Sequence, residues 1–151
     1  YSCLEALEEF VQAGARALDL GTGSGILSIA LAKLGATDII ALDTDPVAVR
    51  AAQKNFELTN IEEYVNAAQG TVPHNLTNEG QFDVVVANIS SRAVGDRSPS
   101  VMAILKPTGV FIASGILKDQ HQDAYDAVKQ SGFASIEVRH REDWVVLICR
   151  P

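Results

Sequence analysis

The sequence predicts an α/β protein built on a Rossmann-like, doubly wound and mostly parallel seven-stranded sheet. First, apolar stretches with strand character alternate along the chain with stretches of helical periodicity. Second, the stretch 82–87 contains three consecutive valines, as expected of a parallel strand covered on both faces. Third, the last two apolar stretches have no helix between them, so we expect an antiparallel hairpin at one edge of the sheet.

In the first half of the chain, periodicity and end signals predict six elements. Strands are predicted at residues 15–20, 38–43 and 64–68, and helices at residues 4–13, 24–34 and 46–58. Leu4, Leu7 and Val11 recur at helical spacing, and Gly35 ends the second helix. The third helix follows an Asp-Pro pair at residues 45–46, and we assign the aspartate to capping because this pair is a common helix start.

The second half predicts four strands and two helices joined by polar connections. Strands are predicted at residues 82–87, 110–114, 134–139 and 144–149, and helices at residues 102–105 and 119–131. Pro107 ends the first of these helices and Gly132 ends the second. The polar segments 70–80 and 90–100 are expected to be loops, the first with room for a short helix. Trp144 begins the last strand, and we expect it in the core of that edge strand.

A glycine-rich turn joins the first predicted strand to the helix that follows it. The segment reads DLGTGSG over residues 19–25, so that Gly21, Gly23 and Gly25 alternate with other residues. Such a turn lets a nucleotide-like ligand lie against bare backbone. Asp43 closes the second predicted strand, where an acid is placed to accept hydrogen bonds from a ribose diol. The sequence therefore predicts a nucleotide-type site at the carboxyl ends of the first two strands.

The spacing of the glycines favours S-adenosylmethionine (SAM) over a dinucleotide. A dinucleotide fingerprint needs glycine at its first, third and sixth places, and the sixth place here is Ile26. Asp19 would repel a pyrophosphate but suits a ligand with an ammonium or sulfonium group. SAM carries both groups, and its ribose suits Asp43. Two other interpretations stay open: Asp19 satisfies backbone N–H groups of the turn, or the turn is purely structural.

Composition fits one compact domain. The 151 residues are 47% hydrophobic, enough to bury a core, and no apolar run reaches the length of a membrane span.

The formal net charge of −7 disfavours a non-specific nucleic-acid binder and is compatible with a basic protein partner. Cys3 and Cys149 lack metal-ligand spacing, so we expect no metal site, free thiols and a cytoplasmic protein. Because the chain starts at Tyr1, inside helical spacing, we expect a further segment upstream.

Segments spread over the whole chain carry a more specific signal. They are CLEAL (3–7), LDLGTGSGILSI (18–29), ALDTDPVAVRAA (41–52), DVVVANI (83–89), LKP (105–107), SGIL (114–117) and REDWVVL (141–147). The glycine turn alone specifies only a superfamily, whereas VVANI, SGIL and EDWV in that order are much more specific. On these segments the chain resembles class I SAM-dependent methyltransferases, and most closely the PrmA family, which methylates a protein of the large ribosomal subunit.

The resemblance implies roles for individual residues. Gly21 matches the family's SAM-contacting glycine, Asp43 the acid that binds the SAM ribose, and Asn88 the asparagine that contacts SAM and faces the substrate amine. The predicted site therefore has Asn88 as its catalytic residue and Asp19, Gly21, Thr22, Gly23, Gly25, Asp43 and Asn88 as its cofactor-binding residues. The resemblance further implies SAM as cofactor and methyl transfer to lysine or amino-terminal amines of a basic ribosomal protein.

The resemblance also implies that residues 1–151 form only the catalytic domain. The family's amino-terminal substrate-recognition domain, and a threonine just ahead of its first helix, have no counterpart in this sequence. After Asn88 the family continues with an apolar segment, whereas residues 90–97 are polar here, on the presumed substrate face. The turn 68–70 lacks the acid that often reaches the adenine amine. Two alternatives stay open: a SAM-dependent enzyme for a small molecule or another protein, and a non-catalytic nucleotide-binding domain.

Overall fold

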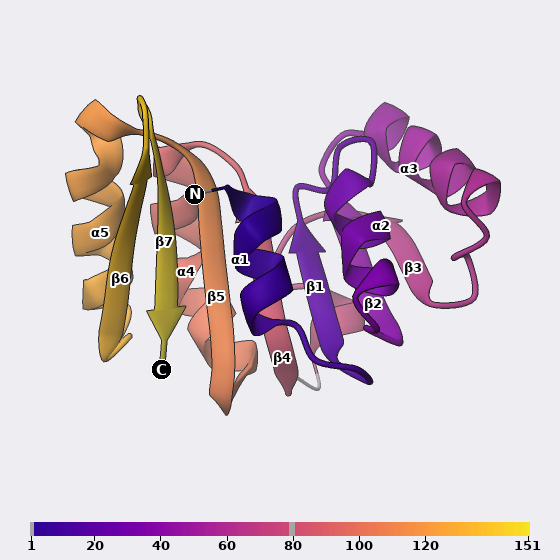
Figure 1. Ribbon diagram of the computed structural model, residues 1–151, viewed down its shortest axis with the longest axis horizontal. Helices are drawn as coiled ribbons and strands as arrows, with labels where there is room; N and C mark the ends of the chain where they lie inside the picture. Colours follow the sequence, from indigo (N-terminus) through magenta and orange to yellow (C-terminus); the bar gives the residue numbers. More distant parts are fainter. Residues whose placement is uncertain (1, 79–80) are drawn as a thin grey trace.

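The computed structural model describes residues 2–78 and 81–151, and it confirms the predicted fold class (Figure 1). Seven strands form one sheet in the order β3-β2-β1-β4-β5-β7-β6. They are β1 (Arg16–Leu20), β2 (Asp38–Asp43), β3 (Val65–Gln69), β4 (Phe82–Asn88), β5 (Leu105–Leu117), β6 (Ser135–Arg141) and β7 (Trp144–Arg150). Pairs from β3 to β5 are parallel, and β7 runs antiparallel to both β5 and β6. The predicted edge hairpin is therefore present.

Helices cover both faces of this sheet. They are α1 (Cys3–Phe10), α2 (Ile26–Lys33), α3 (Pro46–Leu58), α4 (Ser91–Ile104) and α5 (His121–Gln130), with short 3₁₀ turns η1 (Asn75–Thr77) and η2 (Lys118–Gln120). In Figure 1, α1 and α2 lie in front of the sheet and α4 and α5 behind it. Val84 and Val86 pack in the front core, whereas Val85 packs in the back core, as the alternation of strand side chains requires. Burial on both faces explains the continuous valine run.

One predicted loop is a helix. The segment 90–100, predicted as a loop, forms most of α4, so that prediction is wrong. A glycine and a proline lower its intrinsic helix propensity. Val94 and Val101 nevertheless lie on one face of α4 and are fully buried in the back core, and Ser90 caps the helix by accepting a hydrogen bond from the N–H of Ala93 at 3.2 Å. Burial of an apolar face and a cap outweigh propensity here.

Other differences concern where elements end. The first helix ends at Phe10, not at residue 13, and β5 spans 13 residues rather than the predicted 110–114. The expected short helix in segment 70–80 is η1, and residues 79–80 of that segment lie outside the described part. The cap predicted at residue 45 is confirmed, because the Asp45 carboxylate accepts a hydrogen bond from the N–H of Val47 at 2.9 Å.

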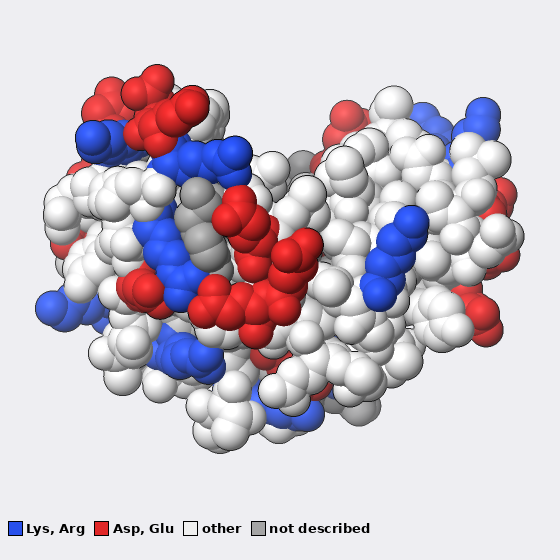
Figure 2. All heavy atoms as spheres, in the orientation of Figure 1, with Lys and Arg blue, Asp and Glu red and all other residues white. Residues whose placement is uncertain are grey.

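Ion pairs join α1 to the edge hairpin. The Arg139 guanidinium bonds the Glu9 carboxylate, and Arg141 Nη1 lies 2.8 Å from Glu5 Oε1. Figure 2 shows acidic side chains over α1 next to basic ones over β6 and β7. Exposed pairs of this kind contribute little energy singly, but they tie the first helix to the strands that flank the site described next.

Candidate functional site

The predicted site residues come together at the carboxyl edge of the parallel strands. β1 lies at the switch point of the sheet, with β2 on one side and β4 on the other. Ligands of open parallel sheets bind outside the strand ends at such a point. The glycine turn follows β1, Asp43 ends β2 and Asn88 ends β4. This edge is uppermost in Figure 1, and Figure 2 shows that the surface is hollowed there.

Asp43 is held in place by backbone N–H groups. Its Oδ2 accepts a hydrogen bond from the N–H of Gly23 at 2.9 Å, and its Oδ1 accepts one from the N–H of Asp45 at 3.0 Å. Each carboxylate oxygen can accept a second hydrogen bond. The carboxylate is therefore oriented before any ligand arrives, and it retains the capacity to accept both hydroxyls of a ribose.

The glycine turn combines close packing with open backbone. The N–H groups of Gly21 and Thr22 both donate to the carbonyl of Leu42 at 2.8 Å, which fastens the turn to the end of β2. Gly25 has a φ of +89°, and a Cβ there would stand 2.5 Å from the Phe56 ring. A Cβ at Gly23 would meet nothing within 4 Å. Gly25 therefore lets α3 approach the turn, while Gly23 leaves space beside Asp43.

Asp19 is fully buried beneath this turn. Its Oδ2 accepts hydrogen bonds from the hydroxyls of Thr22 and Ser28, both at 2.8 Å. Its Oδ1 is buried and has no hydrogen-bond partner among the described residues. Burial raises the pKa of Asp19, and the two hydroxyls oppose that shift. Thr22 thus faces Asp19, and the predicted roles of both residues toward a cofactor remain predictions.

Asn88 stands between two cavities. One, the Asp43 cavity, has a volume of about 400 Å³ and is lined by Gly21, Asp43, Thr44, Gly70, Asn88 and Arg97, among others. The other, the Trp144 cavity, has a volume of about 390 Å³ and is lined by Cys3, Asn88, Ser114, Glu142 and Trp144, among others. Both volumes fall in the usual range of small-molecule sites. The exposed amide of Asn88 is thus shared by two adjoining cavities.

Gly115 is a site residue that sequence reasoning missed. It lies in β5, where the register with β7 shifts between Ala113 and Ile116, and its φ is +80°. A Cβ at Gly115 would stand 2.5 Å from Asn88 Oδ1. Gly115 directly follows the strand predicted at residues 110–114, and a glycine inside a strand signals a bulge or a close approach. Gly115 therefore leaves the space that the Asn88 side chain occupies.

Trp144 is the second residue whose place differs from expectation. It was expected in the core of the edge strand, but it is 51% exposed, so that prediction is wrong. It is the first residue of β7, where it pairs with Leu117 of β5 and with Arg141 of β6, and its ring borders the Trp144 cavity. The prediction failed because the local sequence pattern of a strand does not show whether its first residue borders a cavity or is covered by other elements.

The Trp144 cavity also contains the Cys3 thiol. Burial raises the pKa of Cys3, a hydrogen bond with Ser114 lowers it, and the nearby Asp19 carboxylate raises it further, so that the net shift is upward. A raised pKa keeps the thiol neutral near pH 7. Cys3 therefore contributes a neutral, partly buried wall and not a thiolate nucleophile.

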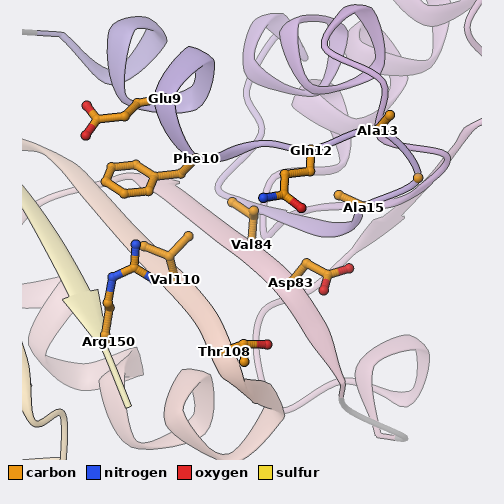
Figure 3. A pocket seen from close by; sticks show the side chains of 11 residues that line it. Glu9, Phe10, Gln12, Ala13, Ala15, Asp83, Val84, Thr108, Val110 and Arg150 are labelled. Atoms are coloured by element: carbon orange, nitrogen blue, oxygen red, sulfur yellow. The ribbon is translucent and has the colours of Figure 1, made fainter.

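A larger hollow lies at the opposite edge of the sheet. Its volume is about 560 Å³, and Figure 3 shows Phe10, Asp83, Thr108 and Arg150 around it. The Asp83 carboxylate lies 2.9 Å from the Lys106 ammonium, and the Arg150 guanidinium lies 5.1 Å from the centre of the Phe10 ring. No predicted site residue lines this hollow. Size alone therefore does not identify the functional site, and the strand ends do.

Within residues 2–78 and 81–151, no cluster of three or more His, Cys, Asp or Glu side chains could hold a metal ion. In the same described part of the chain, none of the helices has the length and apolar character needed to cross a membrane.

Solved structures share the whole fold. The "ribosomal protein L11 methylase" from Lactobacillus delbrueckii subsp. bulgaricus superposes with a TM-score of 0.83 at 30% identity, covering 97% of this chain and 76% of that one. A SAM-dependent O-methyltransferase from Thermotoga maritima superposes with a TM-score of 0.81 at 15% identity, covering 97% and 64%, which shows likeness of fold alone. The topology of the sheet is that of these methyltransferase structures.

Sequence comparison is more specific. The family model "Ribosomal protein L11 methyltransferase (PrmA)" matches residues 1–151. Curated relatives of that name from Halalkalibacterium halodurans and Bacillus subtilis are 43% and 40% identical over 148 residues, which is 98% of this chain and 47% of each relative. The chain belongs to this ribosomal protein L11 methyltransferase family, as the sequence resemblance predicted. It spans about half the length of these relatives.

The residues present fit SAM. The oriented Asp43 carboxylate suits a ribose, and the buried, unpartnered Oδ1 of Asp19 is an acceptor that an ammonium group could satisfy. The open backbone at Gly23 adjoins the Asp43 carboxylate.

Proposed function

We propose that this chain is the catalytic domain of a SAM-dependent methyltransferase that modifies amino groups of a basic ribosomal protein. The observation that carries the proposal is the place of Asn88, whose side chain lines both the Asp43 cavity and the Trp144 cavity. One cavity holds the cofactor and the other admits the amine. We further propose that a substrate-recognition domain lies outside residues 1–151, since the chain spans 47% of its relatives.

Cofactor binding is assigned to the residues of the Asp43 cavity and the turn beside it. Asp43 accepts the ribose hydroxyls, and Gly21 and Gly23 keep the backbone close to the ligand, while Gly25 lets α3 support that turn. Asp19 with its partner Thr22 balances the ammonium group. Bound SAM supplies a methyl group on a positively charged sulfur, which is already electrophilic. The chain therefore needs to hold and align, and it needs no metal for this transfer.

Asn88 aligns the acceptor amine. Its Oδ1 accepts a hydrogen bond from the amine N–H, which points the nitrogen lone pair across the boundary between the two cavities. Alignment of two reactants can lower the activation free energy by up to about 7–11 kcal/mol. A lysine has a reference pKa of about 10.4, and the partly apolar Trp144 cavity lowers it by desolvation. The proton that the lysine ammonium loses before methyl transfer is released to water.

The approach to Asn88 suits a cationic acceptor. Glu142 and Trp144 line the same cavity, so an incoming ammonium meets a carboxylate and an aromatic face. The net charge of −7 favours a basic protein as partner over a nucleic acid. Together with two cysteines that form no disulfide, a ribosomal protein substrate supports a cytoplasmic location.

The test is transfer of a labelled methyl group. The intact protein that contains this chain is incubated with methyl-labelled SAM and purified large-subunit ribosomal proteins, and the labelled protein is identified by mass. We expect label on amino groups of one basic protein. The Asn88→Ala variant should transfer almost none, whereas Asn66→Ala, an exposed asparagine of β3, should act as the unaltered protein does. SAM binding without transfer of label to any of these proteins would contradict the proposal and support one of the two alternatives.

A further inference from the structure

Arg97 is a partly buried cation on the wall of the Asp43 cavity. It lies two turns into α4, and its neighbour one turn earlier, Ala93, lines the same cavity. It makes no hydrogen bond or ion pair with any described residue. On the same helix, Arg92 is 92% exposed and lies 4.0 Å from Asp96. Arg97 therefore lines the cavity without a partner among the described residues that would explain its place.

Arg97 lines the cavity in which, on the proposed binding of SAM, the base must also lie. With ribose on Asp43 and the methyl group near Asn88, a nucleoside ligand has its base left to accommodate. Beyond Asp43, the lining includes Thr44, Gly70 and Thr71 at the ends of β2 and β3, the apolar residues Leu20, Ile89 and Ala93, and Arg97. No acid stands there, and the amide nitrogen of Gln69 donates to the carbonyl of Thr44 at 3.2 Å. Arg97 is thus the one basic side chain among the described residues that line this cavity.

An arginine suits this place for a physical reason. A guanidinium is planar and weakly hydrated, and it stacks on aromatic rings, including the faces of nucleic-acid bases. Lysine carries the same charge but lacks the plane. A guanidinium next to the sulfonium, by contrast, would repel the charged cofactor and favour its uncharged-sulfur product. Contact with the base avoids that repulsion.

On these grounds, and resting on the proposed binding of SAM, we infer that Arg97 stacks on the adenine of the cofactor and secures it in the Asp43 cavity. The polar segment that departs from the family pattern after Asn88 thereby belongs to the cofactor cavity as well as to the presumed substrate face. Arg97 is a binding residue for the adenosine half and takes no part in methyl transfer itself.

The test is calorimetric titration of this chain with SAM, S-adenosylhomocysteine and adenosine. Arg97→Leu removes charge and plane, Arg97→Lys keeps the charge alone, and Arg92→Leu is the matched control on the same helix. Circular dichroism checks that each variant is folded. We expect Arg97→Leu to weaken all three ligands by a similar factor, about five- to thirtyfold. Arg97→Lys should lose most of this affinity, and Arg92→Leu should stay within twofold of the unaltered chain.

Three results would overturn the inference. Unchanged affinities in a folded Arg97→Leu variant would show that the guanidinium does not contact the ligand. Tighter SAM binding with unchanged S-adenosylhomocysteine binding would place Arg97 beside the sulfonium and not the adenine. If Arg97→Leu is neutral while Asp43→Ala weakens binding, only the role of Arg97 fails. If the unaltered chain binds none of the three ligands, the proposed function fails with it.

Discussion

Asn88 and Asp43 divide the carboxyl edge between alignment and cofactor binding. Asn88 lines both cavities, whereas Asp43 lines only the one that we assign to SAM. Asn88→Ala should therefore lower kcat by about 100-fold or more, a loss typical of removing one aligned polar group at the reacting atoms. The dissociation constant for SAM should change by no more than about tenfold, since one hydrogen bond to the ligand at most is lost. Steady-state kinetics with titration of SAM measure both values, and equal losses in kcat and SAM affinity would contradict this division.

A substitution at Gly115 tests whether the position of the Asn88 side chain matters for catalysis. In Gly115→Ala the new Cβ would stand 2.5 Å from Asn88 Oδ1, at a φ of +80°. We expect kcat to fall by about 10- to 100-fold, because displacing an aligned group by about 1 Å costs that much. The left-handed backbone adds about 1–2 kcal/mol of destabilisation. Urea unfolding and kinetics measure the two effects.

Gly14→Ala is the matched control for this prediction. Gly14 has a φ of +83°, but a Cβ there would meet nothing within 4 Å, and it lies at the opposite edge of the sheet. It should lose similar stability and keep its kcat. If Gly115→Ala kept full activity, Gly115 would have no part in placing Asn88.

For single residues, the sequence predicts the acids and glycines of the site better than the residues that hold them in place. Asp43 and the glycine turn are evident from spacing, because few residue types suit a ribose or a left-handed turn. The partners of the Asp19 carboxylate were not predictable, since it accepts hydrogen bonds from two hydroxyls, one of them that of Ser28, nine residues on. Gly115 and Trp144 join the site of Asn88 only because β4, β5 and β7 pair in the sheet. A local sequence pattern does not specify that pairing.

At the scale of elements, Asp83 joins three strands at the amino edge. Its carboxylate accepts hydrogen bonds from the N–H of Arg16 and from the Lys106 ammonium, both at 2.9 Å. Burial raises the pKa of Asp83, but these two partners lower it more, so that the pKa lies below its usual value. Because a depressed carboxyl pKa stabilises the protein above the unfolded pKa of about 3.9, this contribution is lost as pH falls through the folded pKa.

Asp83→Asn should therefore destabilise the chain by up to about 1 kcal/mol at pH 7, a modest value because the pair is about one-third exposed. The difference from the unaltered chain should stay constant between about pH 7 and 5 and narrow below about pH 4. Urea unfolding across this range measures it. A difference that widens in acid would contradict the assignment of the partners.

The elements themselves were predictable where pattern and burial agree. Strands β1, β2 and β4 and helix α3 show their apolar pattern directly. α4 does not, because a glycine, a proline and several serines hide a helix that burial of Val94 and Val101 stabilises. The length of β5 was missed for a related reason: Lys106 and Pro107 break the apolar run, but Leu105 already pairs with Phe82 at the sheet's amino edge. Tertiary packing outweighs local propensity in both places.

At the scale of the molecule, Cys149 reports on whether the whole chain is folded. It is fully buried in the back core, and burial raises its pKa to about 12. A buried neutral thiol does not react. Cys149 should therefore be modified by a thiol reagent only as the chain unfolds, with the same urea midpoint as circular dichroism. Peptide mapping separates it from Cys3, and rapid modification of Cys149 in native buffer would contradict the described core.

The central claim is that the carboxyl edge binds SAM through Asp43. The most direct measurement is calorimetric titration of this chain with SAM and, separately, with NAD, alongside Asp43→Ala and Asp126→Ala, an exposed acid of α5. We predict saturable binding of SAM and none of NAD. Asp43→Ala should weaken SAM by at least about tenfold, since a hydrogen bond to a charged group contributes about 1.5–3 kcal/mol, and Asp126→Ala should change nothing. Binding of NAD in preference to SAM, or SAM binding that is indifferent to Asp43→Ala, would contradict the account.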